Sequence, residues 1–400
     1  MELKVGYKNT EIGVIPEDWT LINFDKAFYF LSTASYSRAE LSKNAKVKYV
    51  HYGDIHTKLE HFLDFKTFEL PTINNEQLKT YNLIKEGDLI MADASEDYEG
   101  IGKSVEVKNI ENVKAISGLH TFLLRGKEGI FSNNFKAYLH SNKIVKTQYD
   151  KLATGLKVYG VSKANLKQIL IPLPPLPEQT AIATVLSDTD SLIQALEKKI
   201  AKKQLIKKRA MQELLTPKEG WDNCQLNDAV DFLDNLRQPI KSGDRIAIRG
   251  IYPYYGASGI IDYVNDYIFD DELILLGEDG ENILSRNLPL AFKVKGKLWV
   301  NNHAHVLKPK SEFAIDFLTA FLESLDYTLL NSGTAQPKLN KQACKKIKIV
   351  KPPFTEQTRI AQILSDMDSE IETLQKKLAK YKQLKQGLMQ SLLTGKIRLV

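Results

Sequence analysis

Apolar residues recur at alternating steps of four and three along two long stretches of this chain. In the second stretch they run from Ile360 to Leu392 with a polar interruption at Lys385. In the first they fill the matching positions from Ile182 to Leu214, with a weaker seam at Thr189 and Lys203. A repeat of about 3.5 residues is typical of helices that pair along a coiled-coil seam. The alternative is a surface helix packed on its own lobe, but both stretches carry the pattern at full length. The predicted seam consists of Ile182, Leu186, Ile193, Leu196, Ile200 and Leu214 in the first helix, and Ile360, Leu364, Met367, Ile371, Leu374, Leu378, Tyr381, Leu388 and Leu392 in the second.

Proline and glycine indicate where both helices begin and end. A proline cluster at 172–177 excludes helix, so the first helix is predicted from Glu178 to about Thr216, just before Pro217. The second is predicted from about Thr355 to Thr394, where Gly395 ends it.

The two helical stretches are copies of one sequence. The segments PPLPEQTAIATVLSDTDSLIQALEKKI (174–200) and PPFTEQTRIAQILSDMDSEIETLQKKL (352–378) align without a gap, and a weaker echo precedes them at Trp19 and Trp221. A module used twice usually meets a partner that is itself twofold.

The length of the helices limits the arrangement of the rest. Each spans roughly 57 Å at ~1.5 Å per residue, whereas the linker from Pro217 to Gly220, with Thr216 counted as well, reaches only about 17 Å. We therefore expect the second lobe at the far end of the first helix, and a second helix that runs antiparallel to it. The predicted fold class is α+β: two mixed α/β lobes separated by a long antiparallel two-helix coiled coil, with a pseudo-twofold internal repeat. The predicted domains are a first lobe (1–176), a first helix (177–216), a second lobe (217–353) and a second helix with the C-terminal tail (354–400).

Composition narrows the class of protein. The net charge of +6 permits a polyanionic partner without requiring one. The two cysteines, Cys224 and Cys344, lack metal-type spacing, so we expect reduced thiols in a cytoplasmic protein. No signal peptide and no run of ~18 apolar residues is present, so no membrane partner is expected.

Two motifs resemble catalytic sites, but each lacks a residue that the chemistry requires. The run from Gly100 to Ser104 ends like a phosphate-binding loop, but the position that needs the first glycine is Asp97. Lys351-Pro352-Pro353-Phe354 resembles a methyltransferase element, but lysine cannot accept the hydrogen bonds of a target amino group. The sequence therefore predicts no catalytic residue.

Metal-binding patterns are equally weak. The seven histidines form no ligand-spaced set with cysteines, although His303 and His305 alternate on one strand. The acidic residues between Asp88 and Glu99 fit a solvated loop better than a nuclease site. No metal site is predicted.

The duplicated helices resemble the conserved regions of type I restriction–modification specificity subunits. The segments SGTAQPKLNKQACKKIKIVKPP (332–353), YYGASGIIDYVNDYIFDDELILLGEDG (254–280) and AFKVKGKLWVNNHAHVLKP (291–309) are also similar to that family. In the family each lobe is a target-recognition domain for one half of a split DNA sequence, and the helices separate the lobes and dock two modification subunits.

The resemblance implies a non-enzymatic, DNA-reading chain with no cofactor of its own. S-adenosylmethionine would bind the modification subunits, and ATP and Mg²⁺ the restriction subunits. The implied partners are therefore double-stranded DNA with a bipartite target, two modification subunits and restriction subunits.

Base edges are read by arginine, asparagine, glutamine and carboxylates, whereas basic residues more often hold phosphates. The candidates of the second lobe lie in predicted loops and glycine-flanked turns. In the first lobe the candidates are Tyr36, Arg38, Lys43, Lys46, Lys58, Lys157 and Tyr159, and in the second Arg237, Gln238, Arg249, Tyr252, Tyr254, Arg286, Asn301, Asn302, His303, Gln336 and Lys338.

Two other classes of protein stay open at this point. One is an enzyme, a stand-alone DNA methyltransferase or nuclease, and the other is a coiled-coil scaffold that does not bind DNA. A specificity chain could also serve a methyl-only system without a nuclease partner.

Overall fold

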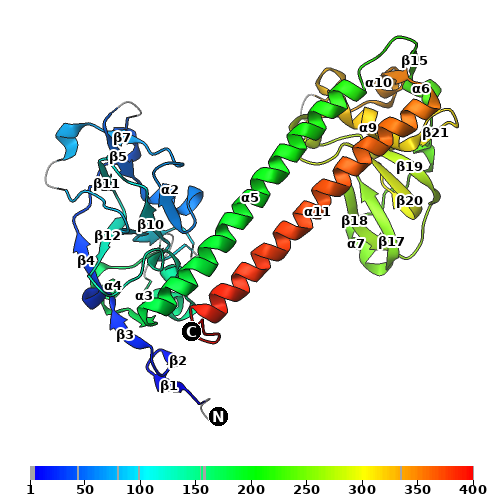
Figure 1. The fold of residues 1–400 in the computed structure, drawn as a ribbon. Helices are drawn as coiled ribbons and strands as arrows, with labels where there is room; N and C mark the ends of the chain where they lie inside the picture. Colours follow the sequence, from blue (N-terminus) through cyan, green and yellow to red (C-terminus); the bar gives the residue numbers. More distant parts are fainter. Residues whose placement is uncertain are drawn as a thin grey trace. The chain divides into compact units, whose positions relative to one another are not determined.

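The computed structural model describes residues 5–42, 45–78, 81–97, 100–153, 155, 159–333 and 336–399. The chain forms two compact units. The first combines Met1–Leu196 with Lys377–Val400, and the second is Glu197–Lys376. Each unit contains one lobe and parts of both long helices, α5 (Leu176–Leu214) and α11 (Phe354–Leu392). The prediction of an α+β chain with two mixed lobes and long helices is confirmed (Figure 1).

The first lobe is built from short strands and short helices. Its largest sheet has the order β4-β12-β8-β10-β6, and a second sheet has the order β11-β5-β7. Smaller pairs are β1-β2, β14-β3 and β13-β9. The strands are β1 (Tyr7–Thr10), β2 (Gly13–Pro16), β3 (Thr20–Asn23), β4 (Phe28–Leu31), β5 (Val47–Val50), β6 (Phe62–Asp64), β7 (Thr72–Ile73), β8 (Leu89–Ala92), β9 (Ala94–Ser95), β10 (Ser104–Lys108), β11 (Ala115–Ser117), β12 (Thr121–Gly126), β13 (Tyr159–Gly160) and β14 (Leu170–Leu173). The helices are α1 (Phe24–Ala27), α2 (Tyr52–Lys58), α3 (Lys143–Leu152) and α4 (Lys163–Gln168), with 3₁₀ turns η1 (Arg38–Glu40), η2 (Asn75–Leu78) and η3 (Lys136–Ser141).

The second lobe is built around one six-stranded sheet with the order β16-β21-β19-β20-β17-β18, and β15 pairs with β22 beside it. The strands are β15 (Asp222–Gln225), β16 (Val230–Phe232), β17 (Arg249–Gly256), β18 (Gly259–Val264), β19 (Phe269–Gly277), β20 (Ala291–Val300), β21 (Ala304–Pro309) and β22 (Lys348–Lys351). The helices are α6 (Leu226–Ala229), α7 (Ser242–Ala247), α8 (Asn282–Ser285), α9 (Ile315–Ser324) and α10 (Lys341–Lys345), with 3₁₀ turns η4 (Asp234–Leu236) and η5 (Thr328–Leu330).

Both long helices begin slightly earlier than predicted. The first starts at Leu176 rather than Glu178, because Pro177 is tolerated in the first turn, where its missing N–H has no helical acceptor. It ends at Leu214, before the predicted Thr216.

A buried glutamine fixes the start of each long helix to its own lobe. The Gln179 side chain donates to the carbonyl oxygens of Pro174 (2.9 Å) and Ile130 (3.0 Å), and it accepts from the Ser132 amide (2.9 Å). Gln357 repeats the arrangement in the second unit with Pro352, Glu312 and Ala314. The repeated sequence therefore makes the same lobe-to-helix contact twice.

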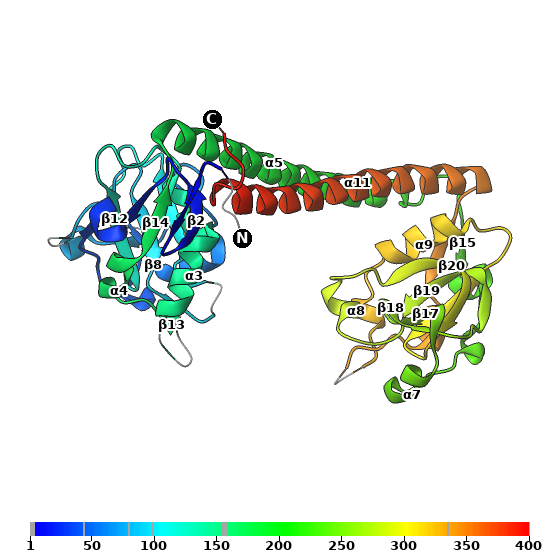
Figure 2. The ribbon, with the colours of Figure 1, turned by 90° about the horizontal axis from the view of Figure 1, so that it is seen from below.

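Within each unit α5 and α11 run side by side in opposite directions (Figure 2). In the first unit Lys385 of α11 pairs with Asp190 of α5, and in the second Lys207 of α5 pairs with Asp368 of α11. These pairs are copies of each other in the repeat. We call α5 and α11 the helix pair.

The predicted seam lies on the inner side of the helix pair. Ten of the fifteen residues are buried: Ile182, Leu186, Ile193, Leu196, Ile200, Ile360, Leu364, Ile371, Leu374 and Leu392. Leu214, Met367, Leu378, Tyr381 and Leu388 are half-buried. At the ends of the pair the seam continues into the lobe cores, where Leu392 and Leu393 join the first and Leu215 and Ile360 the second.

Candidate nucleic-acid interface

Four loops of the second lobe meet at one place. They follow β16, β19, β20 and η5. Backbone hydrogen bonds join the last three, and the Arg237 side chain links the first to them. The Glu278 amide donates to His303 (2.8 Å), the Gly280 amide to Pro337 (3.0 Å), and the Leu339 amide to Glu278 (2.7 Å). The loops therefore form one connected surface.

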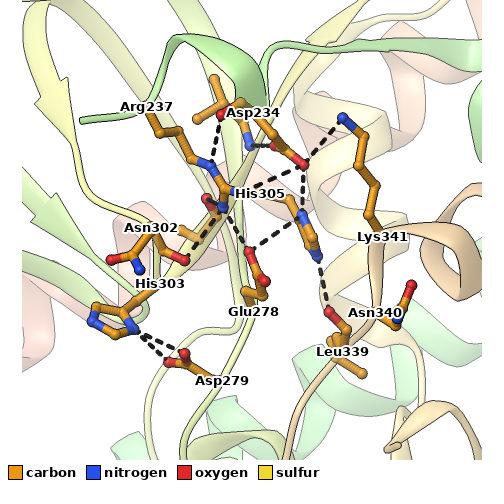
Figure 3. A network of polar contacts seen from close by, with 12 residues as sticks. Asp234, Arg237, Glu278, Asp279, Asn302, His303, His305, Leu339, Asn340 and Lys341 are labelled. Carbon is orange, nitrogen blue, oxygen red and sulfur yellow. Dashed lines mark hydrogen bonds and ion pairs between the residues drawn. The ribbon is translucent and has the colours of Figure 1, made fainter. Parts of the chain in front are cut away.

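A charged network beneath this surface fixes the loops (Figure 3). Arg237 Nη1 donates to Glu278 Oε2 (2.6 Å) and to the Ala304 carbonyl oxygen (2.7 Å). His305 Nδ1 lies 2.9 Å from Asp234 Oδ2, and its Nε2 lies 3.0 Å from the Leu339 carbonyl oxygen. A carboxylate and a carbonyl both accept, so both ring nitrogens donate and the imidazole is protonated.

The electrostatics of the network agree with this protonation. Burial by itself lowers the pKa of His305, but hydrogen bonds to Asp234 and to the Cys344 side chain together raise it to about 10. Burial also works to raise the pKa of Asp234, yet its hydrogen bond to His305 keeps that pKa below the ordinary value. The pair is therefore an internal salt bridge that supports the loops.

The outer rim of the network carries exposed polar side chains. Asn302, Gln336 and Lys338 are exposed, and Lys338 Nζ lies 3.4 Å from Glu278 Oε1. His303 is also exposed, and its Nδ1 lies 2.8 Å from Asp279 Oδ2. Amides, an ammonium and an imidazole are groups that can bind base edges and phosphates.

The structure places the remaining candidates of the second lobe elsewhere. Tyr254 is buried and its hydroxyl accepts from the Ile240 amide (2.9 Å), so it is a core residue that no base edge can reach. Asn301 is likewise buried and holds the His303 amide (2.7 Å). Arg237 is engaged in the network below the surface, which leaves it unable to read guanine without breaking that network.

Four further candidates also lie apart from the rim. Arg286 pairs with Glu323 (2.9 Å), and Tyr252 packs against the ring of Tyr267 at a centroid distance of 5.1 Å. Arg249 is exposed at the start of β17. Gln238 is exposed beside Trp299, whose indole donates to the Gln238 carbonyl oxygen (2.7 Å).

In the first lobe two candidates share one buried carboxylate. Arg38 and Lys58 lie 3.2 Å and 2.9 Å from Asp54 Oδ1, while Asp54 Oδ2 has no partner among the described residues. Both cations are about half exposed, so they could contact a phosphate while they keep Asp54 neutralised.

The other first-lobe candidates are scattered. Tyr36 packs in a small hydrophobic cluster with Tyr49, Lys46 is exposed, and Tyr159 is half-buried in β13. Lys43 and Lys157 lie outside the described residues.

Beside Tyr52, which lies in helix α2 together with Lys58, the structure shows a polar group that the sequence did not reveal. His120 Nδ1 lies 3.2 Å from Asp93 Oδ1, and the Tyr52 ring meets the His120 ring edge-on at 5.4 Å. His120 adopts a left-handed backbone conformation with φ of 55°, which is uncommon outside glycine. The signal that could have found it is the alignment of SGLHTFLL (117–124) with VNNHAHVL (300–307).

The motifs that resemble catalytic sites have structural roles. Lys103, at the end of the loop-like run, donates to the carbonyl oxygen of His56 (2.9 Å). Glu60, His61 and Asp190 are close enough to share a cation, but the Lys385 ammonium pairs with both carboxylates there. The protein thus supplies its own positive charge at that cluster.

A family model described as type I restriction modification DNA specificity domain matches this chain twice, at residues 16–207 and 218–383. Each match spans one lobe and most of one long helix. In the described part of the chain, no helix is both long and apolar enough to cross a membrane.

Individual relatives give the same result. A Methanocaldococcus jannaschii protein, provisionally named the MjaX specificity subunit of a type I restriction enzyme, is 26% identical over 98% of this chain and 97% of its own length. A Haemophilus influenzae protein provisionally named as another such subunit is 37% identical, over a segment that covers only 35% of each chain. The crystal structure of the type I restriction–modification S subunit from M. genitalium has a similar fold, with a TM-score of 0.60, 16% identity and 98% of both chains covered.

Proposed function

This chain belongs to the type I restriction modification DNA specificity family, and we propose that it is the subunit that reads the DNA target of a restriction–modification complex. The observation that carries the proposal is the double match of the family model, one match through each lobe and its helix. Two copies of one DNA-recognition domain fit a target sequence that consists of two half-sites.

Each lobe would read one half of the target through the loops described above. In the second lobe, Asn302 and Gln336 offer amides that suit adenine, and Lys338 suits guanine or a phosphate. In the first lobe, Arg38 and Lys58 would contact the duplex beside Asp54. The buried network beneath the second-lobe loops supports the proposal, because a reading surface must keep its side chains in place.

The helix pair would set the unread gap between the two halves of the target. If both lobes meet the same face of the duplex, the half-sites lie about one helical turn apart, or ~10 base pairs. An insertion of one heptad in each helix lengthens the pair by about 10 Å. We expect such a variant to methylate a target whose gap is longer by about three base pairs.

The outer faces of the helix pair would dock two modification subunits, one for each copy of the repeat. These faces carry exposed lysines at matching positions, Lys198 with Lys199 in α5 and Lys376 with Lys377 in α11. Modification subunits would bring S-adenosylmethionine, and restriction subunits ATP and Mg²⁺. The chain itself would contribute recognition and assembly without catalysis.

The decisive experiment expresses this chain with its modification subunit in a host that lacks methylation, followed by mapping of methylated bases across the genome. The expected result is one bipartite sequence with a fixed gap. A matched host that expresses the modification subunit alone should show no such sequence. Methylation of DNA by the purified chain alone would instead make it an enzyme, and a chain with no salt-dependent affinity for duplex DNA would be a scaffold.

A further inference from the structure

The two lobes place a histidine at the same position of the same substructure. β12 pairs antiparallel with β8 in the first lobe, and β21 pairs antiparallel with β19 in the second. His120 directly precedes β12 and His303 directly precedes β21. The first residue after β8, Asp93, donates its amide to the His120 carbonyl oxygen (3.1 Å), and the first after β19, Glu278, does the same for His303 (2.8 Å).

The surrounding strands agree with this equivalence. The strand just before each histidine loop, β11 or β20, pairs in parallel with β5 or β17. The equivalence therefore rests on both sides of the histidine loop, although the lobes differ in most other residues.

Each histidine is held by a carboxylate through the same ring nitrogen. His120 Nδ1 lies 3.2 Å from Asp93 Oδ1, and His303 Nδ1 lies 2.8 Å from Asp279 Oδ2. Both imidazoles are about half exposed, at 50% and 48% of their side-chain area. The two carboxylates differ by one position: Asp93 is the first residue after β8, whereas Asp279 is the second residue after β19. The histidine–carboxylate contact therefore occurs in both lobes, although the carboxylate is not at the same sequence position.

The free side of each imidazole is available to a ligand. A carboxylate that accepts from Nδ1 fixes the ring orientation and leaves Nε2 directed elsewhere. Figure 3 shows the second nitrogen of His303 pointing away from Asp279 and from the charged network. A polyanion favours the protonated ring, in which Nε2–H donates a charge-assisted hydrogen bond to a phosphate oxygen.

We propose that His120 and His303 are matched phosphate-binding residues, each of which grips the sugar–phosphate backbone at its own half-site. The inference rests on the proposed function. The two halves of a bipartite target differ in their bases but share the sugar–phosphate backbone. In the same way the two lobes share these histidine–carboxylate pairs, while the side chains around the pairs differ. Asn302 and Lys338 lie near one pair, and Tyr52 near the other.

Two substitutions at each histidine distinguish a phosphate contact made by Nε2 from a structural role of the bond between Nδ1 and the carboxylate. Asparagine places an amide where Nδ1 was, so His120→Asn and His303→Asn keep the bond to the carboxylate and remove only Nε2. Glutamine reaches the Nε2 position and should restore part of the contact. Lys167→Ala and Lys308→Ala are the controls, because each removes one positive charge from a surface ion pair in the same unit.

The measurement uses the full chain with its modification subunit, the mapped target duplex and a scrambled duplex of equal length. Affinity is measured by fluorescence anisotropy over a range of salt concentrations. We expect each asparagine variant to weaken binding to both duplexes by the same factor, about tenfold for one charge-assisted bond. The salt dependence should fall by about one unit of slope per histidine, while the mapped target sequence and the melting temperature stay unchanged.

Other outcomes overturn the proposal in distinguishable ways. A loss confined to the target duplex, or relaxed sequence preference at one position, would make the histidine a base-reading residue. Unchanged affinity in the asparagine variants would leave the pairs with a structural role only. If the unmodified chain did not prefer its target over the scrambled duplex, the proposed function itself would fail, whatever the variants do.

Discussion

Lys385→Met should destabilise the first unit strongly. The Lys385 and Asp190 side chains are only 10% and 12% exposed, and Asp190 Oδ2 also accepts from the Tyr138 hydroxyl (2.8 Å). Removal of the lysine leaves the carboxylate buried with one hydrogen bond and no counter-charge. Breaking one partner of a buried ion pair costs about 3–5 kcal/mol, so we expect the free energy of unfolding of this unit to fall by that amount.

The repeat provides a matched control. Lys207 and Asp368 form the copy of this pair in the second unit, but their side chains are 24% and 59% exposed. Solvent screens such a pair, and its loss costs less than about 1 kcal/mol. Lys207→Met therefore removes an equivalent contact in a different dielectric environment, and it should leave stability almost unchanged.

Urea denaturation followed by tryptophan fluorescence separates the two units. Trp19 is buried in the first unit, whereas Trp221 and Trp299 belong to the second. In a Trp221→Phe/Trp299→Phe background the remaining signal reports on the first unit alone and reads Lys385→Met, whereas in a Trp19→Phe background it reports on the second unit and reads Lys207→Met. Equal losses for both lysine variants, or a loss below about 1 kcal/mol for Lys385→Met, would refute the reasoning from burial.

Three further predictions follow from the same cores. Burial lowers the pKa of His61 to about 3. The contribution of the neutral His61 to the free energy of unfolding is therefore fully present above the unfolded pKa of ~6.5 and is lost as the pH falls below it. Between pH 7 and pH 5, urea denaturation should show a smaller decrease in the free energy of unfolding for His61→Gln than for the unmodified chain. The pKa of His305 is raised to about 10, so its pH dependence runs the other way. The contribution of the protonated His305 to the stability of the second unit is fully present below the unfolded pKa of ~6.5 and is lost as the pH rises toward 10. His305→Gln should remove this alkaline loss of stability, as measured by thermal melts followed by circular dichroism. Leu393→Ala should cost the first unit about 2–4 kcal/mol and Leu215→Ala a similar amount in the second, each read from its own tryptophans; a loss in the wrong unit would contradict the core assignments.

The helices could be predicted closely because their signal is local. Apolar residues spaced alternately four and three apart, together with the flanking prolines and glycines, all lie within the helical segments or directly beside them. The bounds were misplaced by no more than two residues at each end, and at the start of α5 the reason is that Pro177 can begin a helix as well as prevent one. The lobes gave no comparable signal, since their sheets join strands distant in sequence, such as β5 with β11 and β16 with β21.

Whether the candidate residues contact DNA stays a prediction, and the sequence could indicate only some of their positions in the fold. Asn302, His303 and Lys338 are predicted in loops or glycine-flanked turns, and they lie exposed in loops of the second lobe. The sequence could not reveal that Arg237 is engaged by Glu278, because the two residues meet only through the fold. Tyr254 shows the converse error: it stands between glycines and aromatics in sequence, yet its side chain points into the core.

The end of α11 and the C-terminal tail complete the core of the lobe that is synthesised first. Leu392 and Leu393 pack in that core, Arg398 pairs with Glu178, and Tyr7 donates to the Gly395 carbonyl oxygen (2.8 Å). A nascent chain therefore cannot complete the core of its first lobe until the residues from Leu392 to Arg398 have been made. A stop codon placed just before Leu392 would destabilise the first lobe, although the second lobe would be fully translated.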